Sequence, residues 1–418
     1  MKLDKNIQGK LNHTFNTGIF LLMNAIPDIC LYLDGPKCNY EKTMSIEKAH
    51  DMFSDIMQRD GYHRILCGGI GVERYIHNQT EVIFKQISKI LEDKRFNGVM
   101  VLPFTMSLAT AFDYENIINR LQNKYGSPIF FISSETYEKD WVGAYDSAML
   151  NVIQKLDFKK GKEEKEKVIL VGHLFDRWEG DNLGNIKEMK RLLSGINLEV
   201  EVTLLDGRKL KEYPANINSN LIISMPYGKR TANYLSKKLN LDLLEVDLPI
   251  GLKSTEGFIK KIAAKTNQEE KANKLITDEL SSVIPKIDKI LPSYIINKNF
   301  IISGDQYLGP ALMESIKELG GQTKKLIIIG DKLDNNIVDC EVLMAPYYTE
   351  IYDMDISTID YIVANSQIKN IMDYREDEKK YNFVNIGYPS EYFHCFTENA
   401  YFGFQGLLNL LNRIVNSK

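Results

Sequence analysis

The residues in this sequence best suited to chemistry are its five cysteines, one of which lies on a distinctive turn. They are Cys30, Cys38, Cys67, Cys340 and Cys395. Cys38 ends the segment Asp34-Gly-Pro-Lys-Cys38, which directly follows the strand-like run 29–33. A Gly-Pro turn presents a thiolate beside free backbone N–H groups, and thiolates are the ligands that iron–sulfur clusters require. The alternative is a small apolar cysteine in a loop.

The other cysteines are weaker candidates. Cys30 lies within an apolar run and Cys67 ends another, so both are predicted to be core residues. Cys395 follows His394 in an aromatic segment, where a ligand pair is the less favoured interpretation and an interface segment the favoured one. Five scattered cysteines without a CxxC pair form neither a disulfide framework nor a zinc site, so we expect a reducing, cytoplasmic location.

Composition and motifs exclude several function classes. The 418 residues are 44% hydrophobic and 26% charged, with a net charge of −4 and no basic region, which argues against nucleic acid as the main ligand. Neither an export signal nor a membrane span is indicated. The GxGxxG, GxxxxGK[ST], HExxH and GxSxG motifs are absent. The segment 225–230 could bind phosphate, but a solvated loop is the favoured interpretation.

A repeated pattern indicates the elements that position these residues. Three times, an apolar run is followed by an amphipathic helical stretch, a Gly or turn, and another apolar run. The predicted strand, helix and strand are 98–102, 113–124 and 128–132, then 168–171, 185–193 and 198–202, then 300–303, 309–319 and 326–329. Each copy is predicted to be a βαβ unit, which requires a parallel sheet covered by helices.

Two charged stretches indicate the domain boundaries. The run 159–167, KKGKEEKEK, is of the solvated kind that separates domains, and 261–289 is a charged helical stretch leading to Pro292. We therefore expect an α/β protein of three Rossmann-like domains, at residues 1–165, 166–291 and 292–418, each with a mostly parallel sheet flanked by helices.

Ligands of such sheets lie beyond the carboxyl ends of the strands, often between domains. His173 and Asp176 follow one predicted strand, and Ser303-Gly-Asp305 ends another. These side chains could line a substrate cavity, and hydrogen-bonded loop structure is an equal alternative.

Several segments, in order along the chain, resemble the component 1 family of nitrogenases and nitrogenase-like reductases. The turn that ends at Cys38 is similar to the family's Gly-Pro-x-Gly-Cys type turn. The other similar segments are 65–76, 98–117, 220–225, 248–252, 386–389 and the closing segment 401–416. Segment 65–76 resembles the family's strand with Gly-Gly and helix, 98–117 its cluster loop and Asp-x-Glu helix, and 220–225 its "Asn-Leu" strand. Segment 248–252 resembles its "Pro-x-Gly" turn, 386–389 its Gly-Phe-Pro turn and 401–416 its final helix.

The resemblance implies a subunit of a nitrogenase-like oxidoreductase. In this family an ATP-dependent iron–sulfur reductase docks on component 1 and passes electrons one at a time to a cluster at the subunit interface, and from there to a substrate in the cleft. The family's substrates range from dinitrogen to tetrapyrrole double bonds and carbon–sulfur bonds, and the sequence selects none of them. The resemblance implies Cys38 as the metal ligand, with Gly35 and Pro36 shaping its turn.

This chain departs from the family at the other ligand positions. Nitrogenase-type subunits each use three cysteines, and the matching positions here are Thr14, Cys38 and Thr105. A hydroxyl is a poor ligand for iron–sulfur iron, and a [4Fe–4S] cluster takes four protein ligands, so one chain cannot hold it by these positions alone. Ser224 stands where catalytic nitrogenase holds its large metallocluster by a cysteine, which leaves that cofactor site unsupported.

Two assemblies would complete a cluster. In the favoured one, a homologous subunit supplies three cysteines and Cys38 the fourth ligand, as the resemblance to dark-operative protochlorophyllide reductase implies. In the other, a homodimer joins two Cys38 residues and recruits His13, Asp34 or Cys30. Two rival functions remain open: a scaffold for assembly of a nitrogenase-type metallocofactor, and a cluster-free binding module on the same fold.

Overall fold

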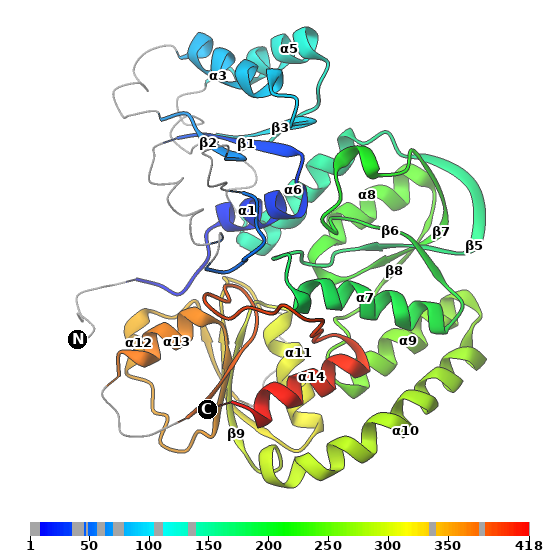
Figure 1. Ribbon diagram of the computed structural model, residues 1–418, viewed down its shortest axis with the longest axis vertical. Coiled ribbons are helices and arrows are strands. Elements are labelled where there is room, and N and C mark those ends of the chain that lie inside the picture. Colours follow the sequence, from blue (N-terminus) through cyan, green and yellow to red (C-terminus); the bar gives the residue numbers. More distant parts are fainter. Residues whose placement is uncertain are drawn as a thin grey trace.

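The computed structural model of this chain describes residues 9–35, 46, 49–56, 63–69, 79–103, 112–132, 139–333, 340–375 and 381–417 (Figure 1). Within these residues three parallel sheets, each flanked by helices, follow one another along the chain. The predicted α/β class with three Rossmann-like domains is confirmed. No described helix is long and apolar enough to cross a membrane.

The N-terminal sheet has the strand order β2-β1-β3-β4, and all its neighbouring strands are parallel. Its elements are α1 (Phe15–Ala25), β1 (Ile29–Asp34), β2 (Ile65–Cys67), α3 (Thr80–Glu92), β3 (Gly98–Pro103), α5 (Tyr114–Tyr125), β4 (Ile129–Phe131) and α6 (Trp141–Lys155). Strand β1 is buried along its whole length because α1 and α6 cover one face of the sheet while α3 and α5 cover the other.

The middle sheet has the order β6-β5-β7-β8. Its elements are β5 (Lys159–Val171), α7 (Gly180–Gly195), β6 (Glu199–Thr203), η4 (Leu210–Glu212), β7 (Asn216–Ser224), η5 (Pro226–Gly228), α8 (Lys229–Leu239), β8 (Asp242–Glu245) and α9 (Leu252–Thr266). The predicted strands and helices of the βαβ units are found here as in the N-terminal sheet.

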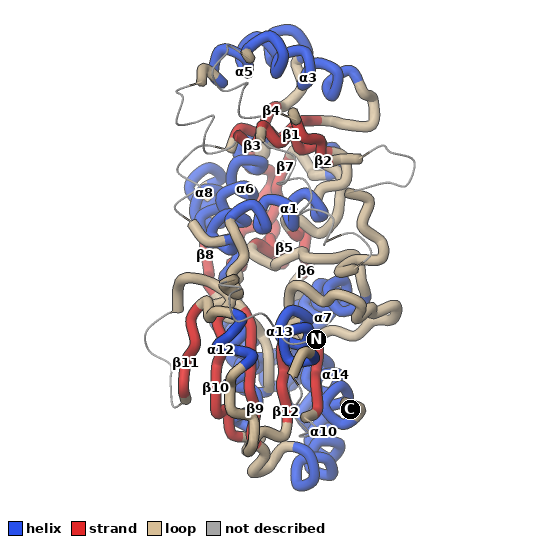
Figure 2. The backbone as a smooth tube through the Cα atoms, turned by 90° about the vertical axis from the view of Figure 1, so that its left-hand side faces the viewer, coloured by secondary structure: helices blue, strands red, loops and turns tan. Residues whose placement is uncertain are grey.

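The C-terminal sheet has the order β11-β10-β9-β12-β13, and Figure 2 shows β11, β10, β9 and β12 side by side. Its elements are α10 (Glu269–Tyr294), β9 (Asn299–Gly304), α11 (Leu308–Glu318), β10 (Gln322–Ile328), β11 (Glu341–Met344), α12 (Tyr348–Tyr352), β12 (Tyr361–Ala364), α13 (Ser366–Asp373), β13 (Asn382–Asn385) and α14 (Gly403–Val415). The closing helix α14 contacts β13 of its own sheet and packs against α7, α9 and α10 as well.

The charged run 159–167 has a different structure from the one expected. It is the exposed half of β5, which pairs with β7 from Lys159 onward, rather than a linker. Its charged side chains are compatible with a strand because most of them face solvent, and the run pairs with β7 at Lys159, Lys160 and Glu164. The predicted boundary at 165 therefore falls within this strand.

Candidate functional site

In each sheet the strand order reverses at one point, and we call the carboxyl-end side of that point the crevice of the sheet. These crevices lie between β1 and β3, between β5 and β7, and between β9 and β12. Open α/β sheets bind ligands at such points, because the loops on the two sides diverge there. The three crevices are therefore the places to test for a site.

The first crevice leads to the predicted ligand turn. Gly35 is buried and directly follows the last residue of β1. Pro36, Cys38 and Thr105 lie outside the described residues, so the role of Cys38 as a ligand stays a prediction.

The residues that lead into this turn are anchored. Tyr114 at the start of α5 donates its hydroxyl hydrogen bond to the buried carboxylate of Asp34. The Cys67 thiol donates to the carbonyl oxygen of Gly35 at 3.2 Å. Cys67 is only partly buried, so its prediction as a core residue is wrong, whereas Cys30 is fully buried as expected. The difference arises because Cys67 ends the edge strand β2 beside the turn.

A cavity of about 360 Å³ lies next to Cys67, on the α3 side of the sheet. Its lining includes Tyr32, Leu66, Cys67, Gln86, Ile90 and Phe96. The Tyr32 hydroxyl donates to Gln86 Oε1 at 2.6 Å, which fixes the wall formed by these two side chains. Cys67, whose thiol donates to the Gly35 carbonyl, thus borders a space large enough for a small molecule.

The described residues do not form a cluster site by themselves. Among them, no group of three or more His, Cys, Asp or Glu side chains could hold a metal ion. Thr14 is exposed, and its side chain does not cap α1. A hydroxyl at that position does not fit a cluster ligand. The shortage of ligands found in the sequence persists in the fold.

The other ligands considered for a homodimer are buried inside this chain. Burial raises the pKa of Cys30 to about 12, which disfavours the thiolate. His13 packs edge-on against the rings of Trp141 and Tyr388, and burial lowers its pKa to about 4. Asp34 is held by Tyr114. These environments oppose recruitment of the three side chains to a subunit interface.

Side chains of the chain itself join the second and third crevices. Tyr227, just beyond β7, donates its hydroxyl to both carboxylate oxygens of Asp305, just beyond β9, at 3.1 and 2.9 Å. The backbone N–H groups of Tyr307 and Leu308 donate to the same carboxylate. Burial raises the pKa of Tyr227 well above its usual range, so the phenol keeps its proton. This contact occupies the position where we considered a substrate cavity.

The turn after β7 is buried, so the prediction of a solvated loop over 225–230 is wrong for its first four residues. Gly172 and Gly228 approach so closely that a Cβ on Gly172 would lie 2.6 Å from the Gly228 nitrogen. This contact seats the turn against the end of β5 and directs Tyr227 toward Asp305. Ser224 is likewise buried, and its hydroxyl donates to the Met225 carbonyl at 3.4 Å.

His173 also belongs to packed loop structure. Its Nε2 lies 3.0 Å from Asn182 Oδ1, and burial lowers its pKa to about 4, so the ring is neutral. Of the two interpretations offered for His173, Asp176, Ser303 and Asp305, the structure favours buried loops, because all four side chains are almost inaccessible.

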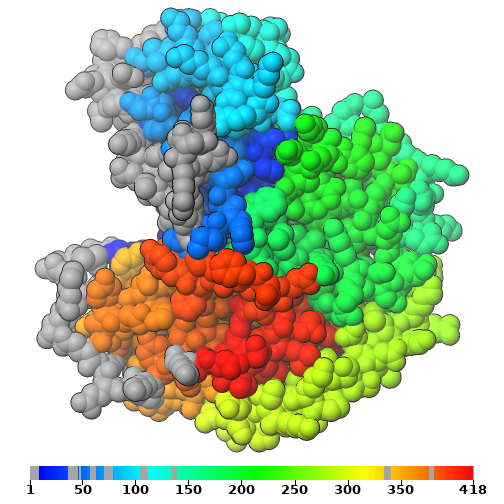
Figure 3. All heavy atoms as spheres, in the orientation of Figure 1, coloured from blue at the N-terminus to red at the C-terminus, as the bar shows by residue number. Residues whose placement is uncertain are grey.

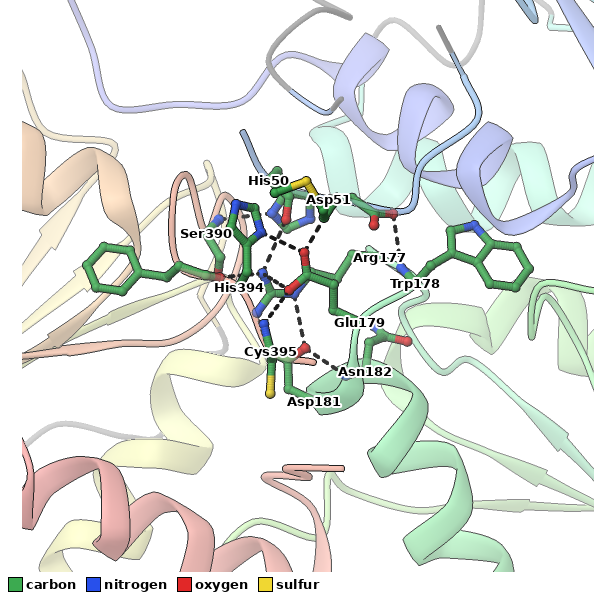
Figure 4. Close-up of polar contacts among 12 residues, drawn as sticks. His50, Asp51, Arg177, Trp178, Glu179, Asp181, Asn182, Ser390, His394 and Cys395 are labelled. Carbon is green, nitrogen blue, oxygen red and sulfur yellow. Dashed lines mark hydrogen bonds and ion pairs between the residues drawn. The ribbon is translucent and has the colours of Figure 1, made fainter. Parts of the chain in front are cut away.

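A buried polar network joins all three sheets through segments 49–56, 176–182 and 390–395 (Figure 4). We call it the three-domain junction; its ionisable residues are His50, Asp51, Asp176, Arg177, Glu179, Asp181 and His394. In Figure 3 the orange-red stretch before α14 touches both blue N-terminal and green middle residues. His394 and Cys395 thus lie in an interface segment, as favoured from the sequence.

Arg177 is the central cation of the three-domain junction. Its Nε donates to Asp181 Oδ1 at 3.0 Å, and its Nη2 pairs with the other oxygen of that carboxylate. Its Nη1 donates to the carbonyls of His50 at 3.2 Å and Phe393 at 2.9 Å. Burial alone would raise the pKa of Asp181, but the charge and hydrogen bonds of Arg177 hold this pKa below its usual value. One guanidinium therefore binds the N-terminal, middle and C-terminal segments together.

Glu179 is the matching anion, and its side chain is completely buried. It accepts hydrogen bonds from the Met52 nitrogen at 3.0 Å, from His394 Nδ1 at 2.7 Å and from the Cys395 nitrogen. Nearby, Asp51 accepts from Asn24 at 2.8 Å and from the Trp178 nitrogen at 3.0 Å. The junction satisfies its charges internally, which is the behaviour of a structural network.

His50 and Asp176 form the neutral side of the junction. The Ser390 nitrogen donates to His50 Nδ1 at 2.9 Å, so the neutral ring carries its proton on Nε2, which faces the Asp176 carbonyl at 3.2 Å. Burial lowers the pKa of His50 well below its usual value and raises the pKa of Asp176 to about 7. The fold therefore favours a protonated Asp176.

The raised pKa of Asp176 predicts that the stability of the folded chain depends on pH. Because the pKa of Asp176 is higher in the folded chain, its contribution to stability is complete below about pH 4 and is lost as the pH rises through about 7. Asp176→Asn should flatten this dependence and raise the free energy of unfolding at pH 8 by about 2 kcal/mol. Urea unfolding of both proteins at pH 5 and pH 8 measures it. If the free energy of unfolding changes between pH 5 and pH 8 by the same amount in both proteins, the raised pKa of Asp176 is contradicted.

His50, Arg177 and Glu179 were not among the residues selected from the sequence. A signal was present, since 176–181, Asp-Arg-Trp-Glu-Gly-Asp, holds four charged residues directly beyond a buried strand. Charges at that position must be paired or form a site. Two hydrogen-bond partners of Arg177, the carbonyls of His50 and Phe393, lie 127 and 216 residues away in the chain, and no local pattern identifies them.

Comparison with known proteins agrees with this architecture. A family model described as nitrogenase component 1 type oxidoreductase matches residues 49–418. Similar curated proteins include a nitrogenase molybdenum-iron protein beta chain from Nostoc sp., 23% identical over 69% of this chain and 60% of its own length. Another is a nitrogenase iron-iron protein beta chain from Rhodobacter capsulatus, 20% identical over 77% of this chain and 76% of its own length. The alignment thus spans only about 60% of the Nostoc relative.

A solved structure has the same overall fold. The structure titled "Nitrogenase Cp1 at pH 6.5" superposes with a TM-score of 0.77 at 17% identity, covering 100% of this chain and 93% of that one. The shared fold extends over all three sheets.

Proposed function

Since the chain belongs to the nitrogenase component 1 type oxidoreductase family, we propose that it is one subunit of a nitrogenase-like reductase that works with a homologous partner chain. The observation that carries this proposal is the contrast among the three crevices. Tyr227 and Asp305 join the second to the third, whereas the first leads from buried, anchored Asp34 and Gly35 into the turn that carries Cys38.

In this proposal Cys38 donates one thiolate to an iron–sulfur cluster, of the [4Fe–4S] type, whose other three ligands come from the partner. The described residues do not fit a cluster held by this chain alone. When bound, such a cluster relays single electrons. The contribution of this chain is to hold the ligand turn through Asp34 and Gly35 and to keep the three domains in register through the three-domain junction.

The resemblance further suggests an ATP-dependent iron–sulfur reductase as the electron donor, in a cytoplasmic assembly, with a small molecule or a tetrapyrrole as substrate. The contact between Tyr227 and Asp305 favours a substrate site on the partner or between the two chains, rather than between the middle and C-terminal parts of this chain. The same contact is equally compatible with the rival function, a scaffold for cofactor assembly without turnover.

The test is anaerobic co-expression of the chain with a homologous chain encoded beside it. We expect about four irons and matching sulfide per purified pair, with an electron paramagnetic resonance signal after reduction. Cys38→Ala should remove most of that iron. Cys340→Ala is the control, because this cysteine is partly buried and packs against Met313 in the C-terminal part, away from the ligand turn.

A complete cluster in the isolated chain that survives Cys38→Ala would falsify the proposal. Reductant-dependent turnover of the pair with its cognate reductase then separates the enzyme from the scaffold. A pair that contains no iron or sulfide supports the cluster-free binding module.

A further inference from the structure

Four large apolar side chains lie exposed beside the three-domain junction. Tyr392 is 78% exposed, Phe396 68%, Phe53 54% and Met52 42%. The rings of Phe53 and Phe396 meet edge to face with their centroids 5.9 Å apart. We call these four residues the aromatic patch. It combines one segment near the N-terminal sheet with one that precedes α14.

The backbone beneath the aromatic patch is fixed. The Tyr392 nitrogen donates to the Ala49 carbonyl at 2.6 Å, which links the two segments directly. Glu179 holds the Met52 nitrogen on one segment and His394 on the other. Tyr392 has a φ of 64°, in the left-handed region that bulky residues rarely adopt. The fold thus keeps a strained backbone that presents a tyrosine to solvent, which is typical of functional surfaces.

The chemistry of the aromatic patch suits a protein surface. None of its four side chains carries a charge, and their exposed area is on the order of 500 Å², at the upper end of what monomers leave uncovered. A stable interface covers about 800 Å² on each partner, so this area corresponds to the apolar centre of one such interface. Aromatic residues and Met are enriched at the centres of protein interfaces, and Tyr is among the residue types enriched at binding hot spots.

We propose that the aromatic patch is the centre of the surface on which the homologous component 1 partner docks. The identity of this partner rests on the proposed function. Met52 and Phe53 follow Cys38 of the proposed ligand turn by 14 and 15 residues in the sequence, and Ala49, whose carbonyl accepts from the Tyr392 nitrogen, lies between Cys38 and Met52. A cluster shared between two chains requires the partner to cover the surface on both sides of that turn.

The test compares two double variants of the chain, each co-expressed with the partner. Phe53→Ser with Phe396→Ser removes the edge-to-face pair, and Ile296→Ser with Tyr374→Ser removes two other exposed apolar side chains, 40% and 45% accessible, as the matched control. We expect the patch variant to weaken the dissociation constant of the pair at least 100-fold and the control to change it less than threefold. Circular dichroism should show the same melting transition for both.

Three outcomes would contradict the proposed docking surface. A patch variant that pairs normally while Cys38→Ala still loses its iron overturns the docking surface and leaves the proposed function intact. If the wild-type chain instead dimerises with itself, and the patch variant is monomeric by light scattering, the occupant is a second copy and the proposal is wrong. If the wild-type chain binds neither the partner nor itself, both the docking surface and the proposed function fail.

Discussion

Arg177→Ala should lower the free energy of unfolding by about 4 kcal/mol, because it removes one member of a buried ion network and leaves its partners uncompensated. Asp181 would lose its bidentate partner, and the carbonyls of His50 and Phe393 would lose a donor. The guanidinium side chain is only 3% exposed, so water cannot replace it without opening the junction.

Urea unfolding monitored by the fluorescence of Trp141 and Trp178 measures this effect. Trp178 adjoins Arg177 and donates a hydrogen bond to the Asn24 carbonyl across the same junction, so its emission reports on it. Lys187→Ala is the control. Lys187 pairs with Glu398, their side chains are 68% and 64% exposed, and the loss of this pair should cost less than about 1 kcal/mol. Equal effects of the two variants would show that the junction adds nothing beyond a surface ion pair.

Gly18→Ala should destabilise the chain by about 3 kcal/mol through overpacking of two helices. Gly18 lies where α1 crosses α6, and a Cβ there would lie 2.0 Å from the Trp141 carbonyl oxygen and 2.8 Å from the Tyr145 nitrogen. Both are backbone atoms, which cannot move aside as a flexible side chain does. The helices would have to separate, exposing part of a core that is otherwise fully buried.

Gly257→Ala provides the opposite control. Gly257 lies exposed within α9, and a Cβ there would meet no atom within 4 Å. Replacing a helical glycine in open space should stabilise the fold by about 0.8 kcal/mol. The midpoint temperature of thermal unfolding should therefore fall for Gly18→Ala and rise for Gly257→Ala, although both variants replace glycine by alanine. A Gly18→Ala protein that melts at or above the wild-type temperature would rule out the close contact of α1 and α6.

The repeating part of the fold could be predicted from the sequence because it depends on local patterns. Buried parallel strands are nearly continuous apolar runs, and the helices between them are amphipathic, so strands such as β3 and β9 and helices such as α5 and α11 lie within a few residues of their predicted bounds. The prediction of a linker over 159–167 was wrong because the polar composition of this run is typical of linkers, whereas pairing with β7 determines its structure.

The contacts that close the crevices could not be predicted in this way. Tyr227 and Asp305 are 78 residues apart, and each is unremarkable in its own segment. Arg177 appears in the sequence as one charge in a polar loop, although its partners come from all three parts of the chain. The candidate ligand, by contrast, was found from a local Gly-Pro-x-Cys turn and its resemblance to a family. Local chemistry can suggest a ligand, but only the assembled fold shows which clefts are filled.

The position of α14 has a consequence for the order in which the protein matures during synthesis. Its apolar face, with Phe404, Leu407 and Leu411 buried, covers α7 and α9, which are made more than a hundred residues earlier. Those helices keep this part of their apolar surface uncovered until α14 has left the ribosome. The middle domain therefore cannot complete its folding as an independent unit during translation, and a nascent chain stalled before α14 should depend on chaperones that shield exposed apolar surface.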